Sequence, residues 1–160
     1  VLIQSLCKVE HENILLYISM GALLESQLFF ATQKGFVKQV SGIGFETNRS
    51  VIASTKLEDD DAIAGITPLS VEDVISPDRK VILITKNGLS LGFPLEEVSE
   101  LKKTGRGIKG IQLDDNDLVQ YAAVVATDCT EICFDQKVYD PKKIRNRKRG
   151  AKGQKAQIKK

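Results

Sequence analysis

Long apolar runs are missing from this 160-residue chain, and so are the cysteine clusters that mark common metal and thiol sites. The longest apolar stretches, such as residues 27–31, are far too short for a membrane-spanning helix. The three cysteines, Cys7, Cys129 and Cys133, form no Cys-x-x-Cys pair, so we expect free thiols and no structural zinc. The start of the chain has neither a methionine nor the basic and apolar segments of a secretory signal. The chain is therefore interpreted as a fragment of a cytoplasmic protein.

Residues that would indicate catalysis are also scarce. The single histidine, His11, has no Ser, Cys or acid arranged around it as a catalytic triad requires. Three tyrosines could be considered as DNA-cleaving nucleophiles, but we expect them to pack in the core or on the surface, because they lie within apolar runs or beside the basic end: Tyr17, Tyr121 and Tyr139. Residues 105–110 are rich in glycine but lack the Gly-Lys-Ser/Thr ending of a phosphate-binding loop. We expect no catalytic residue, no metal and no cofactor in this chain.

Acidic residues are absent from one end of the chain. Residues 142–160 hold ten Lys and Arg and no acid, whereas residues 1–141 hold 13 basic and 21 acidic residues, a net charge of −8. The end segment has no aromatic ring and only two large aliphatic residues, Ile144 and Ile158, which predicts a mobile tail. A basic tail on an acidic body is typical of proteins that bind nucleic acid, and a merely solubilising terminus is the alternative.

Two segments recur along the chain at nearly the same spacing. Residues 28–38 match residues 81–91 at an offset of 53, each with an apolar run, a Thr, a polar pair, a Gly and a second alternating run. Residues 49–61 match residues 105–117 at an offset of 56, with the leucines and the final aspartates in register. Two matched blocks in the same order indicate a repeat protein.

The repeat is predicted to be β structure. Asn87-Gly88 stands between two apolar runs, the strongest short signal for a two-residue hairpin turn with positive φ at both central residues. Gly35 has the same place in the earlier copy. The acidic stretches 58–61 and 114–117 are predicted to close turns, since Asp and Asn side chains bond to nearby backbone. Calcium binding is the less favoured alternative, because the spacing of an EF-hand loop is absent.

Each unit then holds about four short strands in roughly 55 residues, the size of one propeller blade. The predicted fold class is all-β, a propeller-like repeat of about three blades of four-stranded sheets. We expect the repeat domain to span residues 1–141, with units at 1–26, 27–78 and 79–126 and a partial unit at 127–141, followed by the tail 142–160. Residues 10–27 are compatible with a helix or a strand, and the repeat context favours the strand.

The sequence at these residues resembles a known family. Residues 29–38, and residues 105–113 followed by 114–119, are similar to the repeat of the C-terminal domain of the bacterial type IIA topoisomerase A subunit, as in DNA gyrase and topoisomerase IV. The resemblance covers roughly residues 1–125 and implies a β-pinwheel whose rim binds and bends duplex DNA. It also implies a parent enzyme, an ATP-hydrolysing isomerase, in which strand passage uses ATP and magnesium on other domains. The implied partners are DNA, the ATPase B subunit, and the rest of the A subunit.

Basic residues near the predicted turns are the candidate DNA contacts. Lys34 and Lys38 flank a hairpin tip, and Arg106 lies among glycines that let backbone amides approach a phosphate. Cations along a curved rim neutralise successive phosphates, so binding needs no base-specific contact. The candidate residues are Lys34, Lys38, Lys102, Lys103, Arg106, Lys109, Arg147, Lys148, Arg149 and Lys152.

The sequence departs from the family pattern at several positions that concern DNA binding. Residues 147–153 resemble the basic box Gln-Arg-Arg-Gly-Gly-Lys-Gly of gyrase but depart from it at Arg147 and Ala151. Residues 90–93 and Gln39 carry no charge where the family usually has a base. These departures predict weak, salt-sensitive wrapping that depends on the tail, and they favour the topoisomerase IV type slightly. The alternative function is a propeller-like protein-interaction module with a basic anchoring tail.

Overall fold

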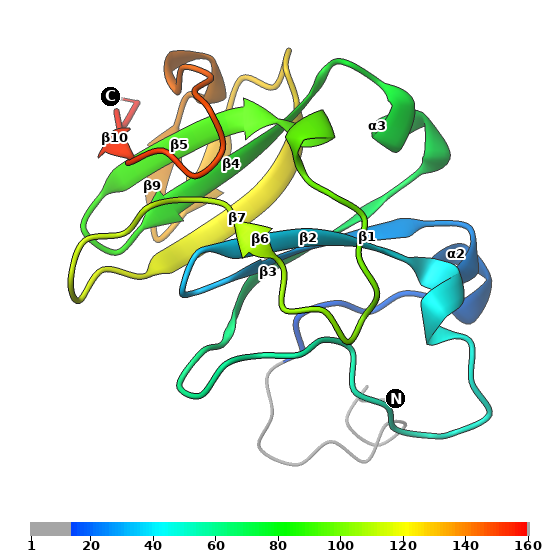
Figure 1. The fold of residues 1–160 in the computed structure, drawn as a ribbon. Coiled ribbons are helices and arrows are strands. Elements are labelled where there is room, and N and C mark those ends of the chain that lie inside the picture. Colours follow the sequence, from blue (N-terminus) through cyan, green and yellow to red (C-terminus); the bar gives the residue numbers. More distant parts are fainter. Residues whose placement is uncertain (1–13, 160) are drawn as a thin grey trace.

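The computed structural model describes residues 14–159, in which two four-stranded antiparallel sheets pack against each other and a short hairpin follows (Figure 1). The first sheet has the order β3-β1-β2-β6 and consists of β1 (Gln27–Thr32), β2 (Phe36–Ser41), β3 (Ile63–Leu69) and β6 (Ile108–Lys109). The second has the order β7-β4-β5-β10 and consists of β4 (Arg79–Thr85), β5 (Leu89–Pro94), β7 (Val119–Ala126) and β10 (Gln154–Lys155). The remaining elements are β8 (Ile132–Phe134), β9 (Lys137–Tyr139), α2 (Met20–Leu24), α3 (Val71–Ile75), η1 (Gly42–Phe45), η2 (Leu95–Glu97) and η3 (Pro141–Lys143).

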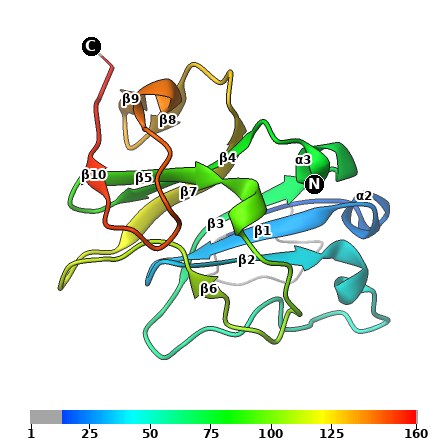
Figure 2. The same ribbon diagram turned by 45° about the horizontal axis from the view of Figure 1, so that its top comes forward.

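The two sheets share one topology, which confirms the predicted all-β repeat. Each sheet is built on a hairpin, β1–β2 or β4–β5, whose first strand pairs with a later strand, β3 or β7. The outer strand of each sheet, β6 or β10, comes from beyond the next hairpin along the chain. Neighbouring repeats are therefore interlocked, because each sheet contains strands from two successive units (Figure 2).

The hairpin loops differ from the predicted two-residue turn. The backbone N–H of Gly88 donates to the carbonyl of Thr85 at 3.0 Å, and Gly88 alone in this loop has positive φ, at 77°. The loop therefore has three residues, a turn followed by a left-handed glycine, and Gly35 (φ 84°) ends an equivalent loop. The two-residue turn with positive φ at both positions occurs instead between β8 and β9, at Asp135 and Gln136.

The acidic stretches close turns, as predicted, and each also holds a hairpin loop in place. The Oδ1 atom of Asp61 accepts a hydrogen bond from the backbone N–H of Lys34 at 2.9 Å. In the next repeat the Oδ1 atom of Asp117 accepts from the backbone N–H of Asn87 at 3.0 Å. The final aspartate of each acidic turn therefore ties the turn to the loop beside it.

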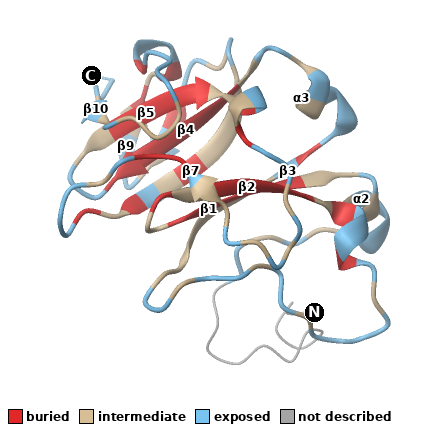
Figure 3. Cartoon of the chain, in the orientation of Figure 1, coloured by how far each residue is buried: buried red, intermediate tan, exposed pale blue. Residues whose placement is uncertain are grey.

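The central strands of both sheets consist largely of buried residues (Figure 3), and apolar side chains pack on both faces of each sheet. The core between the sheets includes Phe29, Val37, Val81, Leu83, Leu91 and Phe93. On its other face the second sheet presents Ile82 and Ile84 to the hairpin β8–β9. The other face of the first sheet carries Leu28, Phe30 and Val40. The two sheets and the β8–β9 hairpin thus form successive layers, and the outer face of the first sheet is covered by Leu23 of α2, Phe45 of η1 and Ile52.

The first unit differs from the strand expected in residues 10–27. Residues 14–18 form no strand with any described residue, and Met20–Leu24 form the short helix α2. Ser19 caps this helix, because its Oγ atom accepts a hydrogen bond from the backbone N–H of Ala22 at 3.3 Å. His11 and Cys7, with the rest of residues 1–13, lie outside the described residues.

The expectation of a mobile tail is wrong for residues 142–159. Ile144 is buried in the core beside the second sheet, and β10 pairs with β5 through Gln154 and Ser90. The ammonium group of Lys80 donates to the backbone carbonyls of Pro141 and Ile144. Backbone pairing and this one apolar anchor order a segment that has too few large side chains to form a core of its own.

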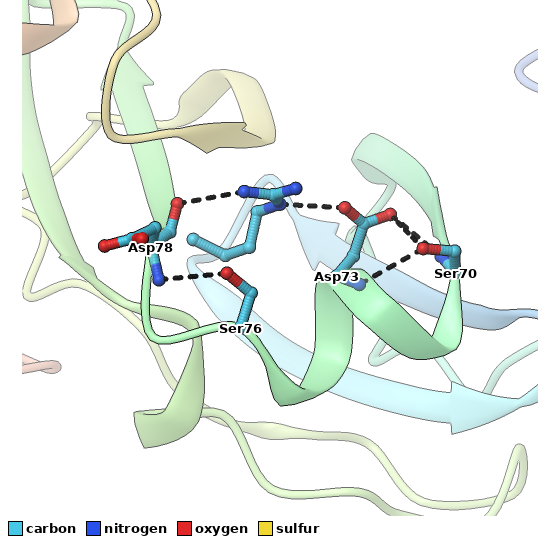
Figure 4. Close-up of polar contacts among 5 residues, drawn as sticks. Ser70, Asp73, Ser76 and Asp78 are labelled. Atoms are coloured by element: carbon cyan, nitrogen blue, oxygen red, sulfur yellow. Dashed lines mark hydrogen bonds and ion pairs between the residues drawn. The ribbon is translucent and has the colours of Figure 1, made fainter.

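A capping box begins α3 and supports a pH-dependent prediction (Figure 4). The backbone N–H of Ser70 donates to Asp73, and this bond, followed by one from Arg79, holds the pKa of Asp73 below its usual value. The carboxylate therefore stabilises the fold above its unfolded pKa, and the effect is lost as pH falls through the lower folded pKa. We expect Asp73→Asn to cost about 0.5–1 kcal/mol in urea unfolding at pH 7, allowing for solvent screening, and clearly less at about pH 3, below the unfolded pKa. The neighbouring change Glu72→Gln is the control, and an equal loss at both pH values would contradict the prediction.

Candidate nucleic-acid interface

Two basic segments run along the outer edges of the two sheets. Residues 101–112 include β6 and carry four Lys or Arg without an acid, and residues 142–155 include β10 and carry eight without an acid. Because β6 pairs with β2 and β10 pairs with β5, the two segments have equivalent places in their sheets. We call the Lys and Arg side chains of these two segments the basic edge.

Hydrogen bonds join the two segments directly. The backbone N–H of Gly150 donates to the carbonyl of Gly110 at 2.8 Å, and that of Gln112 donates to Ala151 at 3.0 Å. Figure 2 shows the segment that leads into β10 running past β5 toward β6. Basic residues that are some 40 positions apart in the sequence therefore lie on one continuous edge.

Most of the candidate residues lie exposed on this edge. The exposed ones are Lys102, Arg106, Lys109, Arg147, Lys148 and Lys152. Lys103 and Arg149 are half-buried. Arg149 donates to the carbonyls of Glu97 at 2.9 Å and Lys109 at 2.6 Å, so its guanidinium group links the two sheets as well as adding charge. Four more exposed bases on this edge were not among the sequence candidates: Lys142, Lys143, Arg145 and Lys155. In the sequence, only the overall basic charge of residues 142–160 pointed to them.

Acidic turns partly neutralise the edge at equivalent points. Arg106 pairs with Glu58 of the acidic turn and stacks over the Phe36 ring at 4.7 Å. Lys152, which has the place of Arg106 in the next repeat, lies 2.7 Å from the carboxylate of Asp114. All four side chains of these two pairs are substantially exposed to solvent, so salt and an incoming polyanion can compete for the cations.

The candidate Lys38 is buried and cannot contact DNA. Its side chain is 2% exposed, and its ammonium group donates to the carbonyls of Lys103 at 2.9 Å and Gly105 at 2.6 Å. Burial lowers the pKa of Lys38. The side chain instead fastens residues 102–106 to the sheet, as Lys80 fastens the start of residues 142–155. Side chains alternate between the two faces of a strand, so position 38 of β2 lies on the same face as Val40. This alternation could have predicted the buried position of Lys38 from the sequence.

The hairpin candidate Lys34 lies beside the acidic turn. Its ammonium group donates to the carbonyl of Asp59, and it lines an open hollow together with Arg106. The structure thus places Lys34 near one end of the basic edge, in an acidic setting.

The remaining sequence candidates show no catalytic arrangement within residues 14–159. Tyr139 is buried in the core, Tyr121 packs against Phe134 with ring centroids 5.3 Å apart, and burial raises the pKa of Tyr121. Tyr17 lies on the surface and is 69% exposed. Residues 14–159 contain no group of three or more His, Cys, Asp or Glu that could hold a metal ion. No helix in this described part is long and apolar enough to cross a membrane.

Face-to-face packing of interlocked four-stranded sheets defines a propeller-like repeat domain. The sequence profile of the family described as "DNA gyrase C-terminal domain, beta-propeller" matches residues 26–70 and 79–126, and the chain belongs to this family. The predicted resemblance to the C-terminal domain of the topoisomerase A subunit is thereby confirmed.

Solved structures agree on the fold. The chain is similar to the C-terminal domain of DNA topoisomerase IV, with a TM-score of 0.69 at 19% identity over 84% of this chain and 45% of that one. It is also similar to the DNA gyrase A C-terminal domain, with a TM-score of 0.63 at 21% identity over 82% of this chain and 43% of that one.

Curated relatives are much longer than this chain. The DNA gyrase A subunit of Helicobacter pylori strain ATCC 700392 / 26695 is 37% identical over 106 residues, which cover 65% of this chain and 12% of the relative. The DNA gyrase A subunit of Chlamydia trachomatis serovar D is 31% identical over 103 residues, which cover 63% of this chain and 12% of the relative. The matched part is therefore about one eighth of these relatives.

Proposed function

We propose that this chain binds and bends duplex DNA, without sequence preference, as part of the A subunit of a type II DNA topoisomerase. The observation that carries the proposal is the basic edge, whose two segments hold twelve Lys and Arg and no acid and follow the outer strands of adjacent sheets. Cations on such an edge neutralise successive phosphates, and the release of counterions favours binding. The added phosphate contacts offset the elastic cost of bending the duplex.

The relatives support the wider setting of this role. They are named as the A subunit of DNA gyrase, and the family profile describes the C-terminal domain of DNA gyrase. In this proposal the ATP- and magnesium-dependent strand passage takes place in the rest of the A subunit and in the B subunit, which carries the ATPase. The only role of this chain is to hold the DNA along a bent path.

Salt dependence tests the proposal directly. We expect the chain to bind a fluorescein-labelled 40-base-pair duplex and a shuffled version of it with equal affinity. A plot of log affinity against log KCl concentration should be linear with a slope of about −5, as about six neutralised phosphates would give. The distance between dyes on the two duplex ends should shorten on binding. Absence of binding at about 25 mM KCl, or a slope near zero, would refute the proposal.

Deletion of residues 142–160 is not a clean test of this function. The deletion removes β10 from the second sheet and Ile144 from the core, so lost binding could reflect lost structure. Substitutions of exposed side chains on the basic edge separate the two effects, because they leave the backbone pairing intact.

A further inference from the structure

The chain segments that contain β6 and β10 can be aligned position by position. Each segment contacts its hairpin at three points, once by strand pairing and twice through a backbone N–H that donates to a hairpin carbonyl. The matched positions are Leu101 with Arg147, Ile108 with Gln154, and Gly110 with Ala156. All three pairs have the same spacing in the sequence, so residues 97–111 correspond to residues 143–157.

Apolar side chains fill the region beside β6 in the first sheet. Val37 and Ile111 are each 1% exposed, and Ile108 packs against the same core between the sheets. The matched positions in the second sheet hold polar residues, namely Ser90, Gln154 and Gln157. Three positions that pack into the core of the first sheet are therefore polar in the second.

These three polar side chains line a cavity of about 220 Å³ beside β5 and β10. Ser90 is 6% exposed, and its hydroxyl group donates to the backbone carbonyl of Gln154 at 3.3 Å. A cavity lined by hydroxyl and amide groups holds water or a polar ligand, whereas an apolar cavity stays dry. The second sheet thus has a polar hollow where the first sheet has packed core.

Four cations line the same cavity, and no acidic residue of the described part does. They are Lys143, Arg145, Arg147 and Lys155. At the matched positions the first sheet has residues whose charges sum to zero: Glu97, Ser99, Leu101 and Lys109. None of the four cations forms an ion pair with a described residue. Their mutual repulsion is therefore uncompensated, and an anion in the cavity would relieve it.

We propose that this cavity is a binding site for a phosphate group. Guanidinium groups such as those of Arg145 and Arg147 donate to phosphate oxygens in pairs, and the two lysines add charge. The Ser90 hydroxyl and the glutamine amides can donate to the remaining oxygens. A carboxylate, with two oxygens and one charge, would satisfy fewer of these donors. The phosphate can belong to a free polyphosphate or to the DNA backbone, and the second source rests on the proposed function.

Calorimetric titration of the chain with sodium pyrophosphate tests the site without DNA. At about 100 mM KCl we expect saturable binding of one anion per chain, since a converging set of cations in a cavity is only partly screened. Arg145→Gln should weaken this binding at least about tenfold, because it removes charged hydrogen bonds while the exposed position keeps the fold intact. Absence of saturable binding up to about 5 mM pyrophosphate would overturn the proposal.

A second variant separates the cavity from the charge around it. Ser90→Val combined with Gln157→Ile introduces the residues that the first sheet has at these positions and keeps every cation. We expect the larger apolar side chains to fill the cavity and abolish pyrophosphate binding. The melting temperature should stay the same or rise, because the matched residues Val37 and Ile111 are buried.

The same two changes at exposed positions, Ser54→Val with Gln120→Ile, are the control and should leave pyrophosphate binding unchanged. Equal binding by the filled variant and the unchanged chain would place the anion elsewhere on the basic edge and overturn the proposal.

Duplex binding by the filled variant identifies the source of the phosphate. Unchanged affinity for the 40-base-pair duplex, with pyrophosphate binding lost, assigns the cavity to a free polyphosphate. A loss of about tenfold or more in duplex affinity assigns it to a backbone phosphate as well, because the variant keeps all the cations that act through long-range attraction. If the unchanged chain bound pyrophosphate but no duplex, the proposed function would fail and the phosphate site would stand.

Discussion

Charge reversal of Lys102, Lys109 and Lys148 together is expected to lower the affinity for duplex DNA by about 10²- to 10³-fold at about 100 mM salt. All three side chains are exposed on the basic edge, and none takes part in an ion pair or side-chain hydrogen bond with another described residue. Each change removes a phosphate contact and adds repulsion, so the slope of log affinity against log salt should become less steep by about three. Fluorescence anisotropy across a salt series measures both quantities.

The charge control reverses three lysines away from the basic edge, Lys86, Lys137 and Lys159, of which the last two form exposed ion pairs with Asp135 and Glu131. Lys86 lies in the β4–β5 loop, Lys137 in β9, and Lys159 beyond β10. The control has the same net charge as the first variant, and we expect it to lower affinity by no more than about fivefold through long-range repulsion alone. Equal losses in the two variants would mean that overall charge, rather than the basic edge, controls binding.

Gly65→Ala is expected to destabilise the fold by more than about 3 kcal/mol. Gly65 lies in β3 where this strand crosses β7, and a Cβ atom there would overlap the backbone carbonyl of Ala122. Because the obstacle is backbone in a packed strand, only separation of the two sheets can relieve the overlap. Urea unfolding followed by circular dichroism measures the loss.

Gly44→Ala is the matched control for this prediction. A Cβ atom at Gly44 would meet nothing within 4 Å, and its φ is not in the left-handed region. The change should therefore alter stability by less than about 1 kcal/mol, with a small gain from reduced freedom of the unfolded chain. A similar small effect for Gly65→Ala would show that β3 and β7 lie farther apart than the structure places them.

The repeat and its turns could be predicted from the sequence because their signals are local. The offset between the two copies, the loop glycine Gly88 and the acidic turns all depend on neighbouring residues. The length of the hairpin loop could not be predicted so well. Asn-Gly favours a two-residue turn, but Asp117, thirty residues away, binds the backbone N–H of Asn87 in the three-residue loop. The ordered structure of β10 could not be predicted from the sequence either, because it depends on pairing with β5 and not on the composition of residues 142–160.

The candidate site could be predicted in charge more accurately than in geometry. A count of Lys and Arg identifies both basic segments, but not the contact between Gly150 and Gly110 that joins them, since tertiary packing alone brings them together. Nearness to a turn predicts a surface position for Lys38, although strand alternation directs it inward. Position along the chain therefore identifies the basic segments. It does not identify the role of Lys38, which depends on the direction of its side chain.

The origin of each outer strand has a consequence for how the protein matures on the ribosome. The β1–β2 hairpin ends at Ser41, but its outer partner β6 ends at Lys109, 68 residues later. At about 5–20 residues per second, that partner emerges roughly 3 to 14 s after the hairpin. During this interval the free edge of β2 can pair with a neighbouring nascent chain. Translation speed across residues 42–109, rather than equilibrium stability, should therefore set the yield of correctly interlocked protein.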